Sequence, residues 1–352
     1  MVASLIQKAV GAPKAELHMH IEGSLQPEMI FALANRNGLR LPFDSVESLR
    51  EAYAFENLQS FLDLYHAGTH VLVTEEDFFD VTAAYVERAI ADNVVHAEIF
   101  FDPQTHLARG VTLEVMIAGM ERALSDAEGR GFSSRLLLCF VRHLHEDAAL
   151  QTLESALPFF ERYSHRLVGI GLDSTELGIP PSTFGRVFAR ARSEGLRCVA
   201  HAGEEGPPEY IVEALDSLCV ERIDHGVTSV RDMTLVKRLV DLRVPLTVCP
   251  LSNLRLKGVA DMKAHPLRML LEAGVLVSVN SDDPAYFGGY VNANYASVID
   301  ALQLNDAQVY RLIRNSFQSA FISDDERATL LLKLDNYWTA TGTLAHRRDL
   351  DA

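Results

Sequence analysis

The chain has 352 residues, of which 48% are hydrophobic and 23% charged, a composition typical of a folded globular protein. Its formal net charge of −16 argues against nucleic acid or an anionic membrane surface as a partner, because both are themselves negatively charged. No run of about 18 uncharged apolar residues occurs, so we expect no transmembrane helix and no membrane partner.

Short apolar runs of β type, most of them ending in polar residues, recur along the chain and alternate with stretches of helical spacing. Eight such runs occur, at residues 15–20, 94–101, 134–142, 167–174, 197–204, 221–226, 245–253 and 276–283. Residues 181–195 and 232–242 are two of the helical stretches between them. Apolar strands that alternate with helices indicate a parallel sheet covered on both faces. Eight such units favour an α/β fold of the (β/α)8 TIM barrel type.

Two segments are longer than the repeat requires. Residues 24–93 exceed one crossover helix and are expected to hold several inserted helices after the first strand, in a position to cap the barrel mouth. Residues 304–345 are expected to form extra C-terminal helices on the outside of the barrel. Because no linker-like tract interrupts the pattern, we expect residues 1–352 to form a single metal-dependent hydrolase domain.

The chain contains four cysteines, at positions 139, 198, 219 and 249. None belongs to a CxxC pair, and each lies in or beside an apolar stretch. We therefore expect buried free thiols and a reducing, cytoplasmic location.

The first and fifth predicted strands end in side chains that suit a metal ion. His18 and His20 are two residues apart, so both imidazoles project from the same face of a strand, and histidine nitrogen suits zinc. His201 ends an apolar strand, and Gly203 permits a sharp turn before Glu204. Taken alone, a pair such as His18 and His20 is more often two unrelated polar residues near a strand. The pattern of His201 and Glu204 is equally compatible with a hydrogen-bonded histidine at a strand end and a solvated glutamate.

The sixth and eighth predicted strands end in further titratable groups. His225 follows Asp224 in a segment that fits either a turn or a general base beside a metal ion. Asp282 and Asp283 are adjacent carboxylates that repel each other unless a positive charge lies nearby. An aspartate-rich turn before proline is the alternative, but a metal ion would explain why two carboxylates follow a buried strand.

All these side chains fall at the C-terminal ends of strand runs, which is where (β/α)8 barrels carry their active sites. Three histidines and one carboxylate form a zinc ligand set with room for water, and the remaining glutamate and histidine supply an acid and a base. The chain has neither a G-x-S-x-G nucleophile elbow nor a phosphate-binding P-loop. The sequence therefore predicts a zinc hydrolase.

The chain resembles the adenosine and adenine deaminases of the amidohydrolase superfamily over roughly residues 13–325. The matching segments are PKAELHMHIEGSL, FFDPQTH, GLDSTE, HAGEEGPPEY, RIDHGV, TVCPLSN and VNSDDPAYFGGY. The resemblance implies a (β/α)8 barrel and a zinc ion bound by four residues, His18, His20, His201 and Asp282. Superfamily members with two metals usually carry a lysine at the end of strand four, whereas LDSTE has none, so one zinc ion per chain is expected.

The resemblance also implies the catalytic roles. Glu204 matches the proton donor to the purine nitrogen N1. His225 matches the residue that orients or deprotonates the water on zinc, a task that it shares with Asp282. Asp283 matches the group that hydrogen-bonds the purine nitrogen N7.

Three features are closest to the adenine deaminase branch. Glu22 stands where the adenosine enzymes have an aspartate that helps to hold the ribose, and its longer side chain would intrude into that space. Asp224 stands where they typically have glycine. Ser174 lies in GLDSTE, where they have a glycine-bearing segment, and is expected to contact the substrate together with Glu22.

The expected reaction is hydrolytic deamination of adenine, a small-molecule purine base, to hypoxanthine and ammonia by a zinc-activated water. The alternatives are deamination of N6-substituted adenines or of adenosine, and, in a different class, a non-catalytic barrel that binds zinc or a purine. The oligomeric state is left open.

Overall fold

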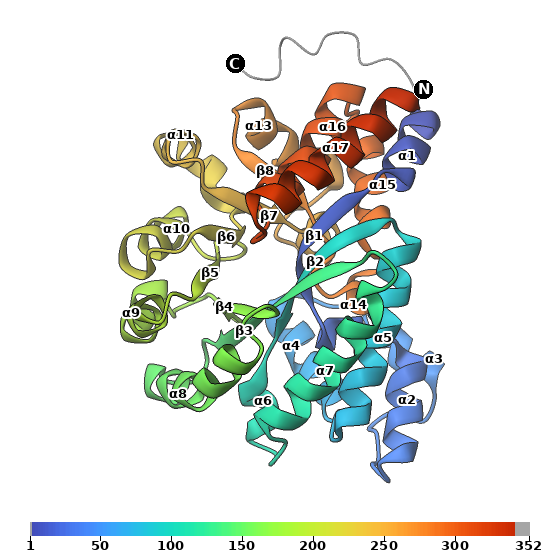
Figure 1. The fold of residues 1–352 in the computed structure, drawn as a ribbon, viewed down its shortest axis with the longest axis vertical. Coiled ribbons are helices and arrows are strands. Elements are labelled where there is room, and N and C mark those ends of the chain that lie inside the picture. Colours follow the sequence, from blue (N-terminus) through green and yellow to red (C-terminus); the bar gives the residue numbers. More distant parts are fainter. Residues whose placement is uncertain (1, 342–352) are drawn as a thin grey trace.

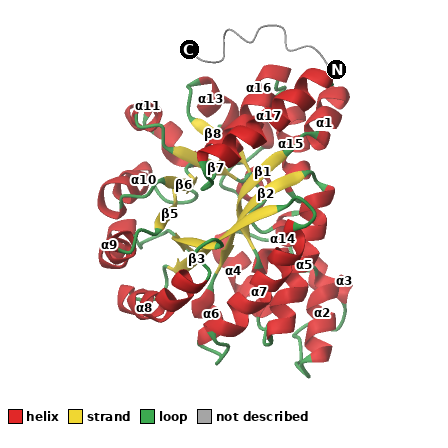
Figure 2. Cartoon of the chain, viewed as in Figure 1, coloured by secondary structure: helices red, strands yellow, loops and turns green. Residues whose placement is uncertain are grey.

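The structure is a computed structural model that describes residues 2–341. Eight parallel strands pair in chain order around a central axis (Figure 1). The strands are β1 (Lys14–His20), β2 (Val94–Phe101), β3 (Ser133–Val141), β4 (Leu167–Asp173), β5 (Arg197–Ala202), β6 (Arg222–His225), β7 (Pro245–Val248) and β8 (Leu276–Val279). Helices surround them on the outside (Figure 2), so the predicted (β/α)8 TIM barrel is confirmed.

The predicted strand runs locate all eight strands, but the last two runs are too long. Residues 249–253 do not continue β7, because Pro250 begins helix α12 (Pro250–Arg255). Proline suits the first helical turn, where its missing N–H is not needed and its fixed φ matches the helix. Residues 280–283 form a loop rather than the end of β8.

The barrel closes through a residue of the predicted site. β1 and β8 meet at an isolated bridge between Met19 and Asp282. The backbone N–H of His20 donates to the Asp282 carbonyl at 3.0 Å, and the Asp282 N–H donates to the His18 carbonyl at 3.1 Å. The hydrogen bonds that close the barrel thus also set the spacing of three predicted metal ligands.

The helices that pack around the strands are α5 (Glu75–Ala91), α7 (Leu113–Glu128), α8 (Glu146–Arg162), α9 (Gly185–Ser193), α10 (Pro208–Glu213), α11 (Met233–Asp241), α13 (Leu267–Glu272), α15 (Val291–Ala301) and α16 (Asp306–Gln318). The stretch predicted as helical at 181–195 contains a 3-10 turn (Pro181–Phe184) followed by α9, and the stretch at 232–242 contains α11. Short helices α6 (Pro103–Leu107) and α14 (Pro284–Phe287) follow β2 and β8.

Residues 24–93 hold four helices, as expected: α2 (Pro27–Arg36), α3 (Val46–Glu51), α4 (Leu58–Thr69) and α5. Local capping explains their boundaries. The Thr74 hydroxyl accepts the Asp77 N–H and the Asp77 carboxylate accepts the Thr74 N–H, a reciprocal cap that begins α5. Helix α4 lies against the short 3-10 turn (Glu22–Ser24) that follows β1, so it covers the C-terminal end of the barrel.

The C-terminal segment also forms the expected helices. α16 packs against both β8 and β1 and so covers the seam of the barrel. α17 (Asp324–Ala340) packs on α16, close to α1 (Val2–Gly11) in Figure 1. The last predicted positions, 342–345, lie outside the described residues.

Within residues 2–341, no helix is both long enough and apolar enough to cross a membrane.

All four cysteines are free thiols. Cys139, Cys198 and Cys249 are buried as expected, but the expectation is wrong for Cys219, which is exposed. Cys219 lies in the turn before β6 with a left-handed backbone, outside the apolar run that suggested burial.

Candidate active site

Four of the predicted site residues form one buried cluster at the C-terminal ends of the strands. His18 and His20 come from β1, His201 from β5 and Asp282 from the loop after β8, and their ligand atoms all lie within 4.8 Å of one another. His20 Nε2 lies 3.3 Å from His201 Nε2, and Asp282 Oδ1 lies 3.4 Å from His18 Nε2 and 3.6 Å from His20 Nε2. His18 Nε2 has no hydrogen-bond partner among residues 2–341.

Acceptors behind the imidazole rings turn Nε2 towards the cluster. His18 Nδ1 lies 3.0 Å from the hydroxyl of Thr247, which itself donates to Asp224 Oδ1 at 2.7 Å. His201 Nδ1 lies 3.6 Å from Asp224 Oδ2. Groups of this kind fix the orientation and tautomer of metal-binding histidines. Asp224, predicted only as a mark of the subfamily, therefore lies directly beneath two of the four clustered residues.

Three predicted site residues have left-handed backbones. Ser174, His225 and Asp282 have φ angles of 70°, 64° and 64°. Non-glycine residues adopt this conformation at a cost of about 1–2 kcal/mol, and such strain gathers at functional sites. His225 is the last residue of β6, Ser174 follows β4 directly, and Asp282 lies in the loop after β8, so all three turns lie at the C-terminal ends of strands.

Glu204 lies in the cavity above the cluster, in a loop held from behind by a second carboxylate. Glu176 accepts the backbone N–H groups of Gly203, Glu204 and Gly206 at 3.1, 3.2 and 2.6 Å. Burial and the carboxylates of Asp282 and Glu176 raise the pKa of Glu204 well above its usual value. Sequence reasoning missed Glu176, although it ends the GLDSTE segment that the resemblance singled out.

His225 faces the same space from β6. Its Nε2 lies 3.6 Å from Glu204 Oε2 and 3.7 Å from Asp282 Oδ2. Burial lowers the pKa of His225 to about 3, so the imidazole is neutral around pH 7. The structure thus brings the predicted acid, the predicted base and the predicted ligand set into one cavity.

Asp283 and Ser174 also line this cavity. Asp283 Oδ1 is buried without a hydrogen-bond partner within residues 2–341, and burial together with Asp282 raises the pKa of Asp283 well above its usual value. A Cβ on Gly23 would lie 1.9 Å from Asp283 Oδ1, so glycine is required there for the carboxyl to keep its place. The Ser174 hydroxyl lies 3.1 Å from His143 Nδ1.

Glu22 is fully buried but is not among the residues that line the cavity. Its Oε1 atom lies 3.0 Å from His106 Nε2 and accepts the backbone N–H of Asp102 at 3.0 Å. Glu22 thus lies behind Asp102, which it holds in position, and its Oε2 atom is buried without a hydrogen-bond partner among residues 2–341.

Two carboxyl groups that sequence reasoning missed line the cavity beside His20. Asp102 follows β2 and Asp173 is the last residue of β4. Both could have been predicted, because polar residues at strand ends were the signal that identified the other site residues. No N–H or O–H group elsewhere in residues 2–341 donates to Asp102 Oδ1 or to either oxygen of Asp173. Burial raises the pKa of Asp173 to about 6, and burial with Asp173 raises the pKa of Asp102 well above its usual value.

A further part of the cavity lining is apolar. It contains Leu58, Phe61, Leu62 and Tyr65 of α4, together with Leu256 and Phe287. An apolar wall facing a few convergent polar groups is the usual character of a small-molecule site, and it suits a flat heteroaromatic ring.

Comparison with known proteins gives consistent results. A family model described as adenosine deaminase matches residues 13–337. The chain is 63% identical over 338 residues to the adenine deaminase of Paraburkholderia phytofirmans, covering 96% of this chain and 97% of that protein. Identity to the adenine deaminase of Paraburkholderia xenovorans is 64%, with the same coverage of both proteins.

Solved structures extend the comparison. The adenine deaminase from Arthrobacter aurescens superposes with a TM-score of 0.90 at 52% identity, covering 94% of this chain and 100% of that one. A zinc-bound amidohydrolase from Burkholderia ambifaria superposes with a TM-score of 0.88 at 26% identity, covering 96% of this chain and 94% of that one. On the family match and these relatives, the chain belongs to the adenosine deaminase family.

Proposed function

We propose that this chain is a zinc-dependent aminohydrolase that converts adenine and water to hypoxanthine and ammonia. The observation that carries the proposal is the convergence of His18, His20, His201 and Asp282 with Glu204 and His225 at one end of a single cavity. Relatives that match nearly the whole chain at 63% and 64% identity are named adenine deaminase, which supports the choice of substrate. The proposal treats the whole chain as one hydrolase domain.

The four clustered residues fit one zinc ion. Two atoms that each bind one zinc ion at about 2.1 Å lie no more than about 4.2 Å apart. The separations of 3.3, 3.4 and 3.6 Å fall within that limit, and two imidazole nitrogens that face each other at 3.3 Å are suited to sharing a cation. Bound there, zinc would lower the pKa of a water molecule to about 7 and so supply a nucleophile.

We propose one ion per chain. A second group of His20, Asp102 and Asp173 also lies close enough to hold a metal, but His20 would then bind one ion through each ring nitrogen. A third group of His225, Cys249 and Asp282 shares Asp282 with the main cluster and so does not form a separate site. The zinc in the Burkholderia ambifaria relative supports the choice of metal.

Glu204 is the proton donor in this proposal. Its raised pKa leaves a proton on the carboxyl, which donates to N1 of the purine as water adds to C6. Neutralising the charge that develops on the ring in this way contributes about 10²–10⁴-fold. C6 becomes tetrahedral; the amino nitrogen takes up the proton that the water has lost, its bond to C6 breaks, and ammonia leaves. The proton of the C6 hydroxyl returns to Glu204, which leaves a carbonyl at C6. His225 Nε2 lies 3.6 Å from Glu204 Oε2 and 3.7 Å from Asp282 Oδ2, so His225 and Asp282 would orient the water and receive its proton.

The purine is held by carboxyl groups. Asp283, whose raised pKa keeps a proton on it, donates to N7, which is an acceptor in the N9–H tautomer of adenine. Asp173, whose pKa of about 6 leaves it mostly ionised at neutral pH, accepts the N9–H, a group that the free base has and nucleosides lack, and the protonated Asp102 lies beside it. Glu22 contributes through Asp102, and Ser174 borders the same space. These contacts favour the free base over adenosine.

The test is ammonia release by the purified protein from adenine, 9-methyladenine, N6-methyladenine and adenosine, with metal analysis of the same sample. We expect adenine to be turned over with a kcat/KM at least about tenfold above that of 9-methyladenine, because the methyl group leaves a buried acceptor unpaired. Preference for adenosine, or no ammonia from any of the four compounds, would contradict the proposal. Preference for N6-methyladenine would keep the chemistry and change the substrate.

A further inference from the structure

Behind His225 lies a line of buried side chains to which the proposed reaction assigns no role. Leu267 is the first residue of α13, and its backbone N–H donates to His265 Nδ1 at 3.1 Å. The first N–H groups of a helix have no partner within the helix, so this donor is available, and an amide N–H cannot act as an acceptor. His265 Nδ1 therefore accepts, and the proton of the neutral ring is on Nε2.

The direction of the next two hydrogen bonds follows from the first. His265 Nε2 lies 3.1 Å from Asn253 Oδ1, so its N–H donates to the amide oxygen. The amide nitrogen of Asn253 then lies 3.3 Å from His225 Nδ1 and donates to it. The orientation of the Asn253 amide is thus set by the Leu267 N–H and does not depend on telling oxygen from nitrogen in that side chain.

Burial protects this order of donors and acceptors. The exposed fractions of Asn253, His265 and His225 are 1%, 3% and 1%, so water has little access with which to replace a partner. Burial also lowers the pKa of His265 to about 4, which keeps its ring neutral near pH 7. In a neutral imidazole one nitrogen donates and the other accepts. Since His225 Nδ1 accepts from Asn253, its proton is on Nε2.

We infer that Asn253 and His265 are positioning residues that hold His225 in the Nε2–H tautomer, so that His225 donates a hydrogen bond into the reaction centre instead of taking a proton from water. This inference rests on the proposed function and removes one of its two alternatives for His225. The Nε2–H points into the space between Glu204 Oε2 and Asp282 Oδ2, at 3.6 and 3.7 Å. His225 orients the attacking water, and the role of proton acceptor is left to another group.

The test is Asn253→Asp, which reverses the direction of the line. A carboxylate accepts but does not donate, so it would accept the proton of His225 on Nδ1 and leave Nε2 without one. We expect the zinc-loaded variant to keep its metal and its KM and to lose at least about 100-fold in kcat. A wrong histidine tautomer costs up to about 10⁴-fold in another hydrolase. Had His225 acted as the base, the same change would preserve or raise kcat.

The tautomer is read directly from ¹⁵N-histidine spectra of the zinc-loaded protein, assigned with a His225→Gln variant. We expect Nε2–H in the wild type and Nδ1–H in Asn253→Asp. The matched pair His265→Gln and His265→Leu separates loss of these hydrogen bonds from general damage to the fold. Glutamine can accept from Leu267 and donate to Asn253, so it is expected to restore most of the kcat that leucine loses.

Two results would overturn the inference: Nδ1–H in the wild type, or full kcat in Asn253→Asp with the tautomer reversed. Neither depends on the identity of the substrate. A wild-type protein that releases no ammonia from adenine would instead contradict the proposed function, while leaving the tautomer measurement intact.

Discussion

The two ends of the barrel bury charge in opposite ways. Below the site, towards the N-terminal ends of the strands, Glu98 and Arg222 are fully buried. Arg222 Nη1 donates to Glu98 Oε2 at 2.5 Å, and Glu98 also accepts the backbone N–H of Phe321. At the C-terminal ends of the strands, oxygens of Asp102, Asp173 and Asp283 are buried, and no N–H or O–H group from the rest of residues 2–341 donates to them. Burying a polar group without a partner costs about 1–3 kcal/mol. Glu98 thus has a counter-charge and a backbone donor within the protein, whereas the three carboxyl groups at the C-terminal end leave oxygens for a ligand.

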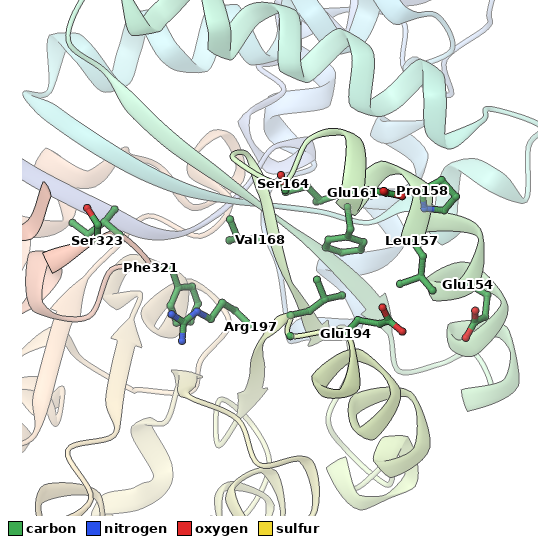
Figure 3. A pocket seen from close by; sticks show the side chains of 15 residues that line it. Glu154, Leu157, Pro158, Glu161, Ser164, Val168, Glu194, Arg197, Phe321 and Ser323 are labelled. Carbon is green, nitrogen blue, oxygen red and sulfur yellow. The ribbon is translucent and has the colours of Figure 1, made fainter. Parts of the chain in front are cut away.

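Cavity size alone would have pointed to the wrong end. A groove of about 850 Å³ opens at the N-terminal ends of β4 and β5. Figure 3 shows it between Phe321 and Arg197 on one side and Leu157 and Glu154 on the other. Of its charged groups, Arg197 pairs with Glu221, and Glu154 with Arg190 at 2.7 Å. What distinguishes the candidate site is its group of buried carboxyl oxygens without hydrogen-bond partners, and not the volume of a groove.

The largest expected effect comes from removing a proposed zinc-binding side chain at the C-terminal ends of the strands. Asp282→Ala is expected to lower zinc affinity by more than about 100-fold, the upper range for lost supporting groups around a metal, and to abolish turnover. Metal content by mass spectrometry and ammonia release measure both. Asp283→Asn is the matched control, because it should weaken adenine binding and keep zinc. A fully metallated Asp282→Ala protein would remove Asp282 from the ligand set.

The next effect separates chemistry from metal binding. Glu204→Gln keeps the size of the side chain but has no acidic proton, so kcat is expected to fall by about 10²–10⁴-fold at unchanged zinc content. Glu205→Gln, in the adjacent position outside the cavity, should stay close to the wild type. Near-normal turnover by Glu204→Gln would show that another group protonates the ring.

Sequence and structure agree where a short rule is sufficient. His18 and His20 share a face because strand side chains alternate, and parallel strand ends meet at one edge, which brings His201 and Asp282 to them. Asn253 and His265 were beyond such rules, because the role of each depends on the direction of hydrogen bonds between loops. The position of Glu22 behind Asp102 likewise depends on the path of the chain after β1.

A smaller effect is expected from the carboxylate that holds the acid. Glu176→Gln presents an amide N–H₂ to three backbone donors, so the loop loses part of its support and kcat should fall about tenfold. Glu204 works in its protonated form, so activity is lost as pH rises through its pKa. After burial and Asp282, Glu176 is the next contribution to the raised pKa of Glu204. In Glu176→Gln that pKa is expected to fall, so the alkaline limb of the pH profile should move to lower pH.

The control for this change is Glu209→Gln, which removes an exposed charge from the helix that follows the same loop. Its pH profile should match that of the wild type. An unshifted alkaline limb in Glu176→Gln would mean that Glu204 does not determine it.

The smallest effect is expected in the groove at the N-terminal ends of β4 and β5. Arg197→Ala removes an ion pair whose side chains are 52% and 41% exposed, and such pairs contribute less than about 1 kcal/mol to stability. We expect kcat/KM for adenine within about twofold of the wild type and a small change in the free energy of unfolding, measured by urea denaturation. A large loss of activity would break the contrast between the two ends.

The most direct measurement is a zinc titration of the chelator-treated protein, followed by ammonia release from adenine. The account predicts almost no activity without metal, a linear rise on addition of zinc, and saturation at one ion per chain with hypoxanthine formed in equal amount to ammonia. Full turnover without metal, or saturation only at two ions per chain, would contradict it.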